Sequence, residues 1–191
     1  MTRPQPIDAN WYDYQRFYDV AMRSETAMEA DFVEAACRKY CRFRVKRLLE
    51  PGCGAGRLVA EMASRGYEMV GLDRNRPSLD YLRRRLAQRR LKANVFEADM
   101  AEFGLSKRVD AAFCTVNTFR HLLTEKAARR HLECIAQSLR PGGIWIVGRT
   151  WEHDCSNHVS LLRRSDRGWE LLERIGTGWE MEPAALGGTW V

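Results

Sequence analysis

The clearest candidate for chemistry in this sequence is a glycine-rich loop. Residues 50–57 read Glu-Pro-Gly-Cys-Gly-Ala-Gly-Arg, so every second position from 52 to 56 is a glycine. Glycine lets the backbone turn sharply and come close to a ligand that a Cβ atom would push away. Turns use glycine as well, so the loop alone is a weak signal, and its surroundings must decide whether it binds a ligand.

An acidic residue at a suitable separation strengthens the ligand-binding interpretation. Asp73 follows an apolar segment about 20 residues beyond the loop, where nucleotide-binding folds place a carboxylate that accepts hydrogen bonds from ribose hydroxyls. The alternative is that Asp73 only shapes the turn before the next helix. The loop reads G-x-G-x-G rather than the G-x-G-x-x-G of dinucleotide-binding folds, and this spacing disfavours a nicotinamide cofactor.

Alternating strands and helices would position this loop. Short apolar runs predict five strands, separated by segments with the spacing of amphipathic helices. This alternation predicts a Rossmann-like, doubly wound α/β fold, in which helices cover both faces of a mostly parallel sheet. Ligands of such sheets bind beyond the carboxyl ends of the strands, where the strand order reverses. The predicted strands span residues 45–49, 67–72, 94–98, 109–115 and 144–148.

Residues typical of helix ends mark the helices between these strands. Thr26 and Glu29 have the spacing of a capping box at the start of a helix that precedes the sheet. Asn75 and Pro77 are expected to mark the start of one later helix, and Thr124 is expected to begin another. Residues 141–143, Pro-Gly-Gly, are expected to close the helix that Thr124 begins.

Four motifs within residues 45–148 resemble those of class I S-adenosylmethionine-dependent methyltransferases. Residues 50–57 are similar to that family's first motif, an acidic residue followed by G-x-G-x-G, and residues 71–75, Gly-Leu-Asp-Arg-Asn, are similar to its second. Residues 97–100, Glu-Ala-Asp-Met, resemble the third, and residues 139–148 resemble the turn and strand after the family's fourth helix. The resemblance covers a little over half of the chain and implies S-adenosylmethionine as the cofactor.

The resemblance also implies a set of cofactor-binding residues. Gly52 and Gly54 would leave room for the methionine part, and Glu50 would bind its amino group, unless Glu50 only holds the loop in place. Asp99 would accept a hydrogen bond from the adenine amine, and Met100 would stack on the ring, unless Met100 is simply part of the core. The full candidate set is Tyr18, Glu50, Gly52, Gly54, Gly56, Asp73, Arg74, Asp99, Met100 and Thr115.

The segment after the fourth predicted strand bears on the methyl acceptor. Residues 114–121 read Cys-Thr-Val-Asn-Thr-Phe-Arg-His, without the Asn-Pro-Pro-aromatic loop that nucleic-acid and many protein methyltransferases carry at this place. The resemblance therefore implies a small-molecule acceptor, with Asn117 and His121 as candidate catalytic residues. A turn or cap role for Asn117 and simple packing for His121 are open alternatives. A general base is needed only if the acceptor arrives protonated.

Composition restricts the remaining function classes. The chain of 191 residues fits one domain, lacks an apolar stretch of membrane-spanning length and has no apolar signal core, so we predict a cytoplasmic protein without a membrane partner. The net charge of +6 could indicate an RNA partner. The largest basic clusters, at residues 83–85 and 89–92, lie on or just after a predicted helix without interleaved aromatics, which disfavours nucleic acid. The six cysteines are expected to be structural thiols. Residues 153–158 fit no zinc pattern, so no metal is expected.

We expect three segments along the chain. Residues 1–44 would form a lid-like aromatic segment and helix, in which Tyr18 either contacts the cofactor or packs on the sheet edge. Residues 45–150 would form the cofactor-binding core. Residues 151–191 are short for the family's usual last strands, so a partial or truncated acceptor region is expected. This shortness keeps a catalytically idle nucleoside-binding module open as an alternative, beside an RNA methyltransferase. The sequence indicates no oligomeric state.

Overall fold

The computed structural model describes most of the chain. It covers residues 14–115, 118–150, 157–165, 168–175, 181–182 and 189–190. For residues 18, 21, 149–150, 157–158, 175, 181–182 and 189–190 the backbone alone is described.

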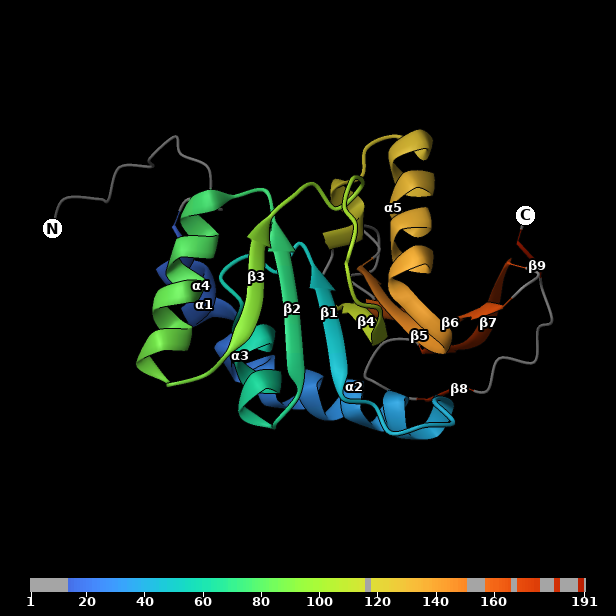
Figure 1. Ribbon diagram of the computed structural model, residues 1–191, viewed down its shortest axis with the longest axis horizontal. Helices are drawn as coiled ribbons and strands as arrows, with labels where there is room; N and C mark the ends of the chain where they lie inside the picture. The colour runs from blue at the N-terminus through green and yellow to red at the C-terminus, as the bar shows by residue number, and fades with distance from the viewer. Residues whose placement is uncertain are drawn as a thin grey trace, which may run out of the picture.

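One sheet runs through the described residues (Figure 1). Its strand order is β3-β2-β1-β4-β5-β6-β7, and the first five strands along the chain are parallel to one another. This arrangement confirms the predicted Rossmann-like α/β fold. The order reverses between β1 and β4, which is where ligands bind in such sheets. The parallel strands are β1 (Arg47–Pro51), β2 (Glu68–Asp73), β3 (Ala93–Glu97), β4 (Val109–Cys114) and β5 (Leu139–Thr150).

Two antiparallel strands extend the sheet beyond β5. The strand β6 (Asn157–Ser165) pairs with β5, and β7 (Gly168–Ile175) pairs with β6. Two short segments, β8 (Met181–Glu182) and β9 (Thr189–Trp190), pair with β7. The segment after residue 150, expected to complete the sheet only in part, thus adds two strands of eight or more residues to it.

Helices cover both faces of the sheet. Buried side chains of α2 (Thr26–Tyr40), α3 (Arg57–Ser64) and α4 (Arg76–Gln88) form a core with one face. Buried side chains of α5 (Glu125–Ser138) form a second core with the other face. The amino-terminal helix α1 (Gln15–Met22) leads through the short helix η2 (Arg23–Glu25) into α2, and the short helix η3 (Thr118–His121) follows β4.

The central strand β4 explains why the fold has two cores. All six of its residues are buried, as expected for a strand with helices on both faces. Side chains alternate across a strand, so Phe113 packs into the α2–α4 core while Ala112 and Cys114 pack into the α5 core.

The helix ends agree with the sequence in two places. Asn75 accepts a hydrogen bond from the backbone N–H of Ser78 at 2.9 Å, and Thr124 accepts one from the N–H of Ala127 at 3.1 Å. Both predicted helix starts are therefore confirmed, and each residue also caps its helix.

Two predicted helix boundaries were wrong. The Thr26–Glu29 capping box does not form, because η2 runs directly into α2 and the Thr26 hydroxyl donates instead to the carbonyl of Met22 at 3.3 Å. Residues 141–143 do not close α5, which ends at Ser138. They lie inside β5, where the pairing with β4 shifts register.

Candidate functional site

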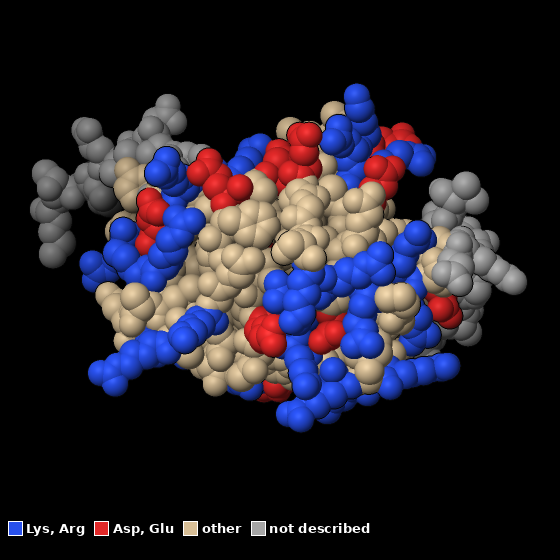
Figure 2. Space-filling model, in the orientation of Figure 1, with Lys and Arg blue, Asp and Glu red and all other residues tan. Residues whose placement is uncertain are grey.

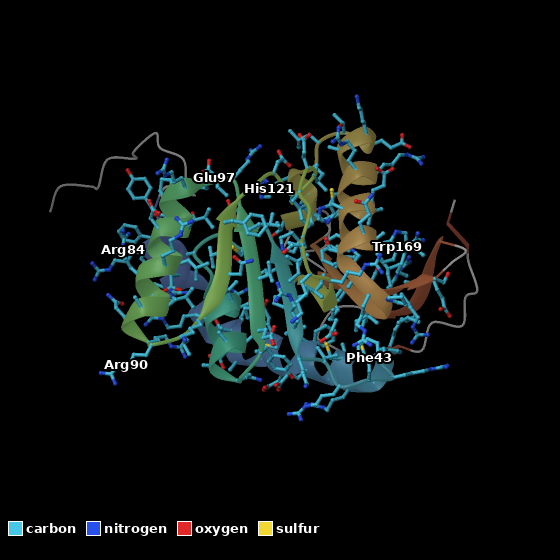
Figure 3. The ribbon with its side chains drawn as sticks, in the orientation of Figure 1. Phe43, Arg84, Arg90, Glu97, His121 and Trp169 are labelled. Atoms are coloured by element: carbon cyan, nitrogen blue, oxygen red, sulfur yellow. The ribbon has the colours of Figure 1, made fainter. Side chains whose placement is uncertain are left out.

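A cavity of about 870 Å³ lies at the carboxyl ends of the parallel strands. It opens where β1 and β4 meet, the point at which the strand order reverses. Figure 3 shows His121 and Glu97 at this end of the sheet and Phe43 at the opposite end. The fold therefore places this cavity where the α/β architecture predicts a ligand. Its lining includes Glu50, Gly52, Gly54, Gly56, Arg57, Asp73, Arg74, Asp99, Met100, Thr115, Thr118 and His121.

The three loop glycines have left-handed backbone conformations but different surroundings. Their φ angles are +65° at Gly52, +51° at Gly54 and +66° at Gly56. A Cβ atom would collide with Thr118 at Gly52 and with Leu82 of α4 at Gly56. At Gly54 a Cβ atom would meet no heavy atom within 4 Å. Gly52 and Gly56 therefore permit close packing, while Gly54 leaves space free at the cavity.

Asp73 connects the glycine-rich loop to the end of β2. One carboxylate oxygen accepts a hydrogen bond from the backbone N–H of Gly54 at 2.8 Å, and the other accepts one from the N–H of Asn75 at 2.7 Å. A carboxylate offers about four acceptor positions, so Asp73 can accept further bonds from a ligand. Its neighbour Arg74 is exposed and also lines the cavity.

Asp99 and Met100 form another part of the cavity wall. Asp99 is exposed, and one of its oxygens accepts a hydrogen bond from the backbone N–H of Ala101 at 2.7 Å. The carbonyl of Met100 lies 2.8 Å from Nδ1 of His131, a fully buried side chain. Burial lowers the pKa of His131, so the ring is neutral and donates from Nδ1 to this carbonyl. This hydrogen bond fixes the Met100 backbone beside the cavity.

A cluster of buried charges lies beneath the glycine-rich loop. Glu29 of α2 is fully buried and accepts hydrogen bonds from Arg57 Nη2 at 2.5 Å and from the Thr115 hydroxyl at 2.6 Å. The nearby Glu50 carboxyl has one oxygen, Oε2, that is buried without a hydrogen-bond partner. Burial and the Glu29 charge raise the pKa of Glu50 to about 8, against the opposing effect of Arg57. A buried carboxyl oxygen without a partner at a cavity wall fits a ligand that brings a positive charge.

Polar contacts hold the helix α1 beside the glycine-rich loop. The amide of Gln15 donates to the Ser78 hydroxyl at 3.1 Å, and Asp19 forms an ion pair with Arg85. Arg85 also donates to the carbonyl of Ala55 at 3.2 Å, so it links α1 to the glycine-rich loop. Tyr18 lies on this helix, but its side chain is outside the described residues.

The side expected to face the acceptor is described in part. Asn117 lies outside the described residues. His121, the last residue of η3, is exposed and lines the cavity together with Leu122 and Leu123, of which Leu123 is 89% exposed. The structure therefore brings His121 to the cavity mouth, and its catalytic role stays a prediction.

The cavity brings together every candidate cofactor residue whose side chain the structure describes. Contact of each residue with a bound cofactor stays a prediction. Sequence reasoning missed Glu29 and Arg57. Arg57 follows the last loop glycine directly, and an acidic Glu29 among the apolar residues of α2 was a signal of a buried charge that the capping-box interpretation hid.

The described part of the chain holds no group of three or more His, Cys, Asp or Glu side chains arranged for a metal ion. The five described cysteines carry free thiols. Residues 151–156, and with them Cys155, lie outside the described residues, and so does the side chain of His158.

The Glu50 pKa gives a testable dependence of stability on pH. Its folded-state pKa of about 8 exceeds the unfolded value, so the folded protein holds this proton more tightly. That stabilisation is complete below the unfolded pKa and is lost as the pH rises through about 8. Between pH 6 and pH 8 the ligand-free protein should lose about 2 kcal/mol that a Glu50→Gln variant keeps, because one pKa unit corresponds to about 1.4 kcal/mol.

Thermal unfolding of both proteins across this pH range measures the effect. The Glu133→Gln variant, which changes an exposed glutamate on α5, is a suitable control and should follow the wild type. Equal pH dependence of the wild type and Glu50→Gln would mean that Glu50 is already ionised in the folded protein.

The chain is similar to known methyltransferases in sequence. A family model described as a methyltransferase domain matches residues 48–143. A protein of Geobacillus sp. (strain WCH70) named as a methyltransferase is 24% identical over 182 residues, which are 93% of this chain and 68% of that protein. The chain spans about half the length of other curated relatives that it matches.

Two solved structures share its fold. An S-adenosylmethionine-dependent methyltransferase from Clostridium acetobutylicum ATCC 824 has a TM-score of 0.64 and 14% identity, over 91% of this chain and 83% of that one. An amino pentose methyltransferase from Micromonospora echinaspora with bound S-adenosylmethionine has a TM-score of 0.61 and 23% identity, over 90% of this chain and 76% of that one.

Proposed function

Because the chain belongs to the methyltransferase domain family of S-adenosylmethionine-dependent enzymes, we propose that it transfers a methyl group from S-adenosylmethionine to a small-molecule acceptor. The observation that carries this proposal is the cavity at the strand-order reversal. It combines an open loop position at Gly54, a ribose-type carboxylate at Asp73 and, at Glu50, a carboxyl oxygen without a partner.

These features match the parts of the cofactor. Gly54 leaves space beside the loop, and Asp73 has acceptor capacity left for ribose hydroxyls. Asp99 and Met100 would hold the adenine end, and Glu50 would lie against the ammonium group. Their combination fits a nucleoside that carries a charged amino-acid end.

Positioning is what this chain contributes to the chemistry. When bound, S-adenosylmethionine supplies a methyl group on a positively charged sulfur. The residues of the cavity hold that group and the acceptor in line and reduce the water around them, which supplies much of the rate of a displacement reaction. His121 at the cavity mouth would take a proton from an acceptor that arrives protonated.

Two observations support a small acceptor. A cavity of about 870 Å³ falls in the ordinary range of about 300–1,000 Å³ for small-ligand sites, so an acceptor that shares it with the cofactor must be small or present a small group. The solved relative from Micromonospora echinaspora is an amino pentose methyltransferase. Amino sugars therefore belong among the first acceptors to be tested.

Transfer of labelled methyl groups tests the proposal. The protein is incubated with methyl-labelled S-adenosylmethionine and panels of amino sugars, hydroxylated aromatics, amino acids, peptides and RNA, and products are identified by mass spectrometry. Transfer into a small molecule supports the proposal. Cofactor binding without transfer to any panel would favour an idle nucleoside-binding module instead.

The arrangement of basic residues disfavours an RNA acceptor. On α4, Arg83 pairs with Asp80 at 2.8 Å, and Arg85 pairs with Asp19. Figure 3 shows Arg84 and Arg90 directed away from the sheet, on the outer side of the molecule. Figure 2 shows Lys and Arg side chains over the lower part of the visible face with acidic side chains among them, as on an ordinary solvated surface.

We therefore predict only weak, salt-insensitive binding to tRNA or duplex DNA. A protein that tracks phosphates releases counterions, so its affinity falls steeply as salt rises. Filter binding across a salt series should give a slope corresponding to fewer than about two phosphate contacts. Tight binding with a steep slope, together with methyl transfer into RNA, would establish the RNA methyltransferase alternative.

No helix within the described residues combines the length and the apolar composition that a membrane crossing demands.

A further inference from the structure

The buried ion pair between Glu29 and Arg57 has no role in the proposal above. Glu29 is fully buried on α2, and its carboxylate binds Arg57 Nη2 at 2.5 Å and the Thr115 hydroxyl at 2.6 Å. Arg57 and Thr115 both line the cavity. A buried ion pair contributes little net stability, because removing two charges from water costs about as much as their attraction returns. Its place beneath the cavity wall points to a role in the site.

Arg57 has hydrogen-bonding capacity left over. A guanidinium group carries five N–H donors. Among the described residues, its acceptors are Glu29 and, at 3.4 Å, the Thr26 hydroxyl. The side chain is only 11% exposed and belongs to the cavity lining, so donors that these acceptors leave unused are available to a ligand in the cavity.

A guanidinium group and an acidic side chain thus lie together at the cavity wall. The Glu50 carboxyl has an unpartnered oxygen, and Arg57 is close enough to shift the pKa of Glu50. An α-amino acid carries an ammonium group and a carboxylate on one carbon atom. A guanidinium matches a carboxylate through two parallel N–H···O bonds, and a carboxylate matches an ammonium group.

We propose that Arg57 binds the carboxylate of the cofactor's amino-acid end and that Glu29 is the positioning residue that holds Arg57 for this task. The inference rests on the proposed function, because it takes S-adenosylmethionine as the ligand. Glu29 binds the guanidinium from the side of α2, so Arg57 forms its ion pair with Glu29 rather than with Glu50. Glu50 then stays available for the ammonium group.

Three ligands separate the groups involved. S-adenosylhomocysteine carries the ammonium group and the carboxylate, S-adenosyl-thiopropylamine carries the ammonium group alone, and methylthioadenosine carries neither. Calorimetry with the wild type should show S-adenosylhomocysteine binding at least about tenfold more tightly than S-adenosyl-thiopropylamine, since charge-assisted hydrogen bonds are the strong ones. Equal affinities for these two ligands would overturn the inference without any variant.

Variants then assign the effect to residues. Arg57→Gln should abolish the preference for the carboxylate and change the affinity of the other two ligands by less than about twofold. Glu29→Gln should reduce the same preference in part, and Arg57→Lys should retain part of it, because a charge remains without the planar fork. Glu50→Gln should weaken both ammonium ligands and spare methylthioadenosine. Arg129→Gln, an exposed change on α5, is the control.

Other outcomes have equally definite meanings. Equal losses for all three ligands in a folded Arg57→Gln variant would show that Arg57 only shapes the cavity, and would overturn the inference. If Arg57→Gln fails to fold because Glu29 is left buried and unpaired, the Glu29→Gln/Arg57→Gln double variant carries the same expectation. Wild-type protein that binds none of the three ligands would refute the proposed function as well. Binding of methylthioadenosine without a preference for the carboxylate would refute this inference alone.

Discussion

Replacement of Gly54 by valine should abolish cofactor binding while the sheet stays folded. A Cβ atom at Gly54 meets no heavy atom of the protein within 4 Å, so the branched side chain would extend into the cavity. The affinity for S-adenosylhomocysteine should fall by at least about 100-fold, because the ligand and the side chain would compete for the same space. Calorimetry measures the affinity, and circular dichroism with thermal unfolding measures the fold.

The variant also carries a backbone cost that needs a matched control. Gly54 has a φ of +51°, and a side chain in that conformation costs about 1–2 kcal/mol of stability. Gly66, with a φ of +92°, likewise has no heavy atom within 4 Å of its Cβ position, and it lies at the far end of α3 outside the cavity lining. Gly66→Val should therefore lose similar stability and bind the cofactor normally. Normal binding by Gly54→Val would reduce the loop to an ordinary turn.

The fold and the position of the site follow from patterns that are local in sequence. Strand and helix periodicities differ, so their alternation over residues 45–148 indicates a parallel sheet before any contact is known. The site then follows from topology, since ligands bind beyond the carboxyl ends of the strands. The loop glycines, Asp73 and Asp99 could therefore be predicted as neighbours, although they come from three different strand ends.

Contacts between distant segments could not be predicted in the same way. The Thr26–Glu29 spacing is typical of a capping box, but Glu29 instead binds Arg57, 28 positions along the chain. The choice between these partners depends on how α2 packs against the loop, and no local pattern encodes that packing. Leu139 continues the helical spacing of Leu132 and Ile135, yet it begins β5. Its pairing with Val109 of β4 extends the strand to that point.

For Asp73, the two interpretations of the sequence, a turn residue and a ribose-binding carboxylate, are compatible with each other. The turn interpretation describes its hydrogen bond from the N–H of Asn75, and the same carboxylate also accepts from the loop N–H of Gly54. The proposed ribose-binding role would add to these bonds. A simple loss of affinity in a variant cannot separate the two roles, because the loop would loosen in either case.

Asp73→Ala should weaken S-adenosylhomocysteine binding by about 1–3 kcal/mol, because a charged acceptor of hydrogen bonds is removed from the cavity wall. A second measurement uses an analogue of S-adenosylhomocysteine that lacks the ribose 2′-hydroxyl. The wild type should bind this analogue more weakly than the parent ligand, whereas Asp73→Ala should bind both with nearly the same affinity. The two changes would then be strongly non-additive, as expected for groups in direct contact.

Asp80→Ala gives the matched control for this cycle, since it removes a carboxylate from α4 that pairs with Arg83 and does not line the cavity. It should preserve the full difference between the parent ligand and the deoxy analogue. If Asp73→Ala preserves that difference too, the carboxylate acts only by holding Gly54 and Asn75 in place. The ribose would then be recognised by other groups at the ends of β2 and β3, with the exposed Arg74 as the first to test.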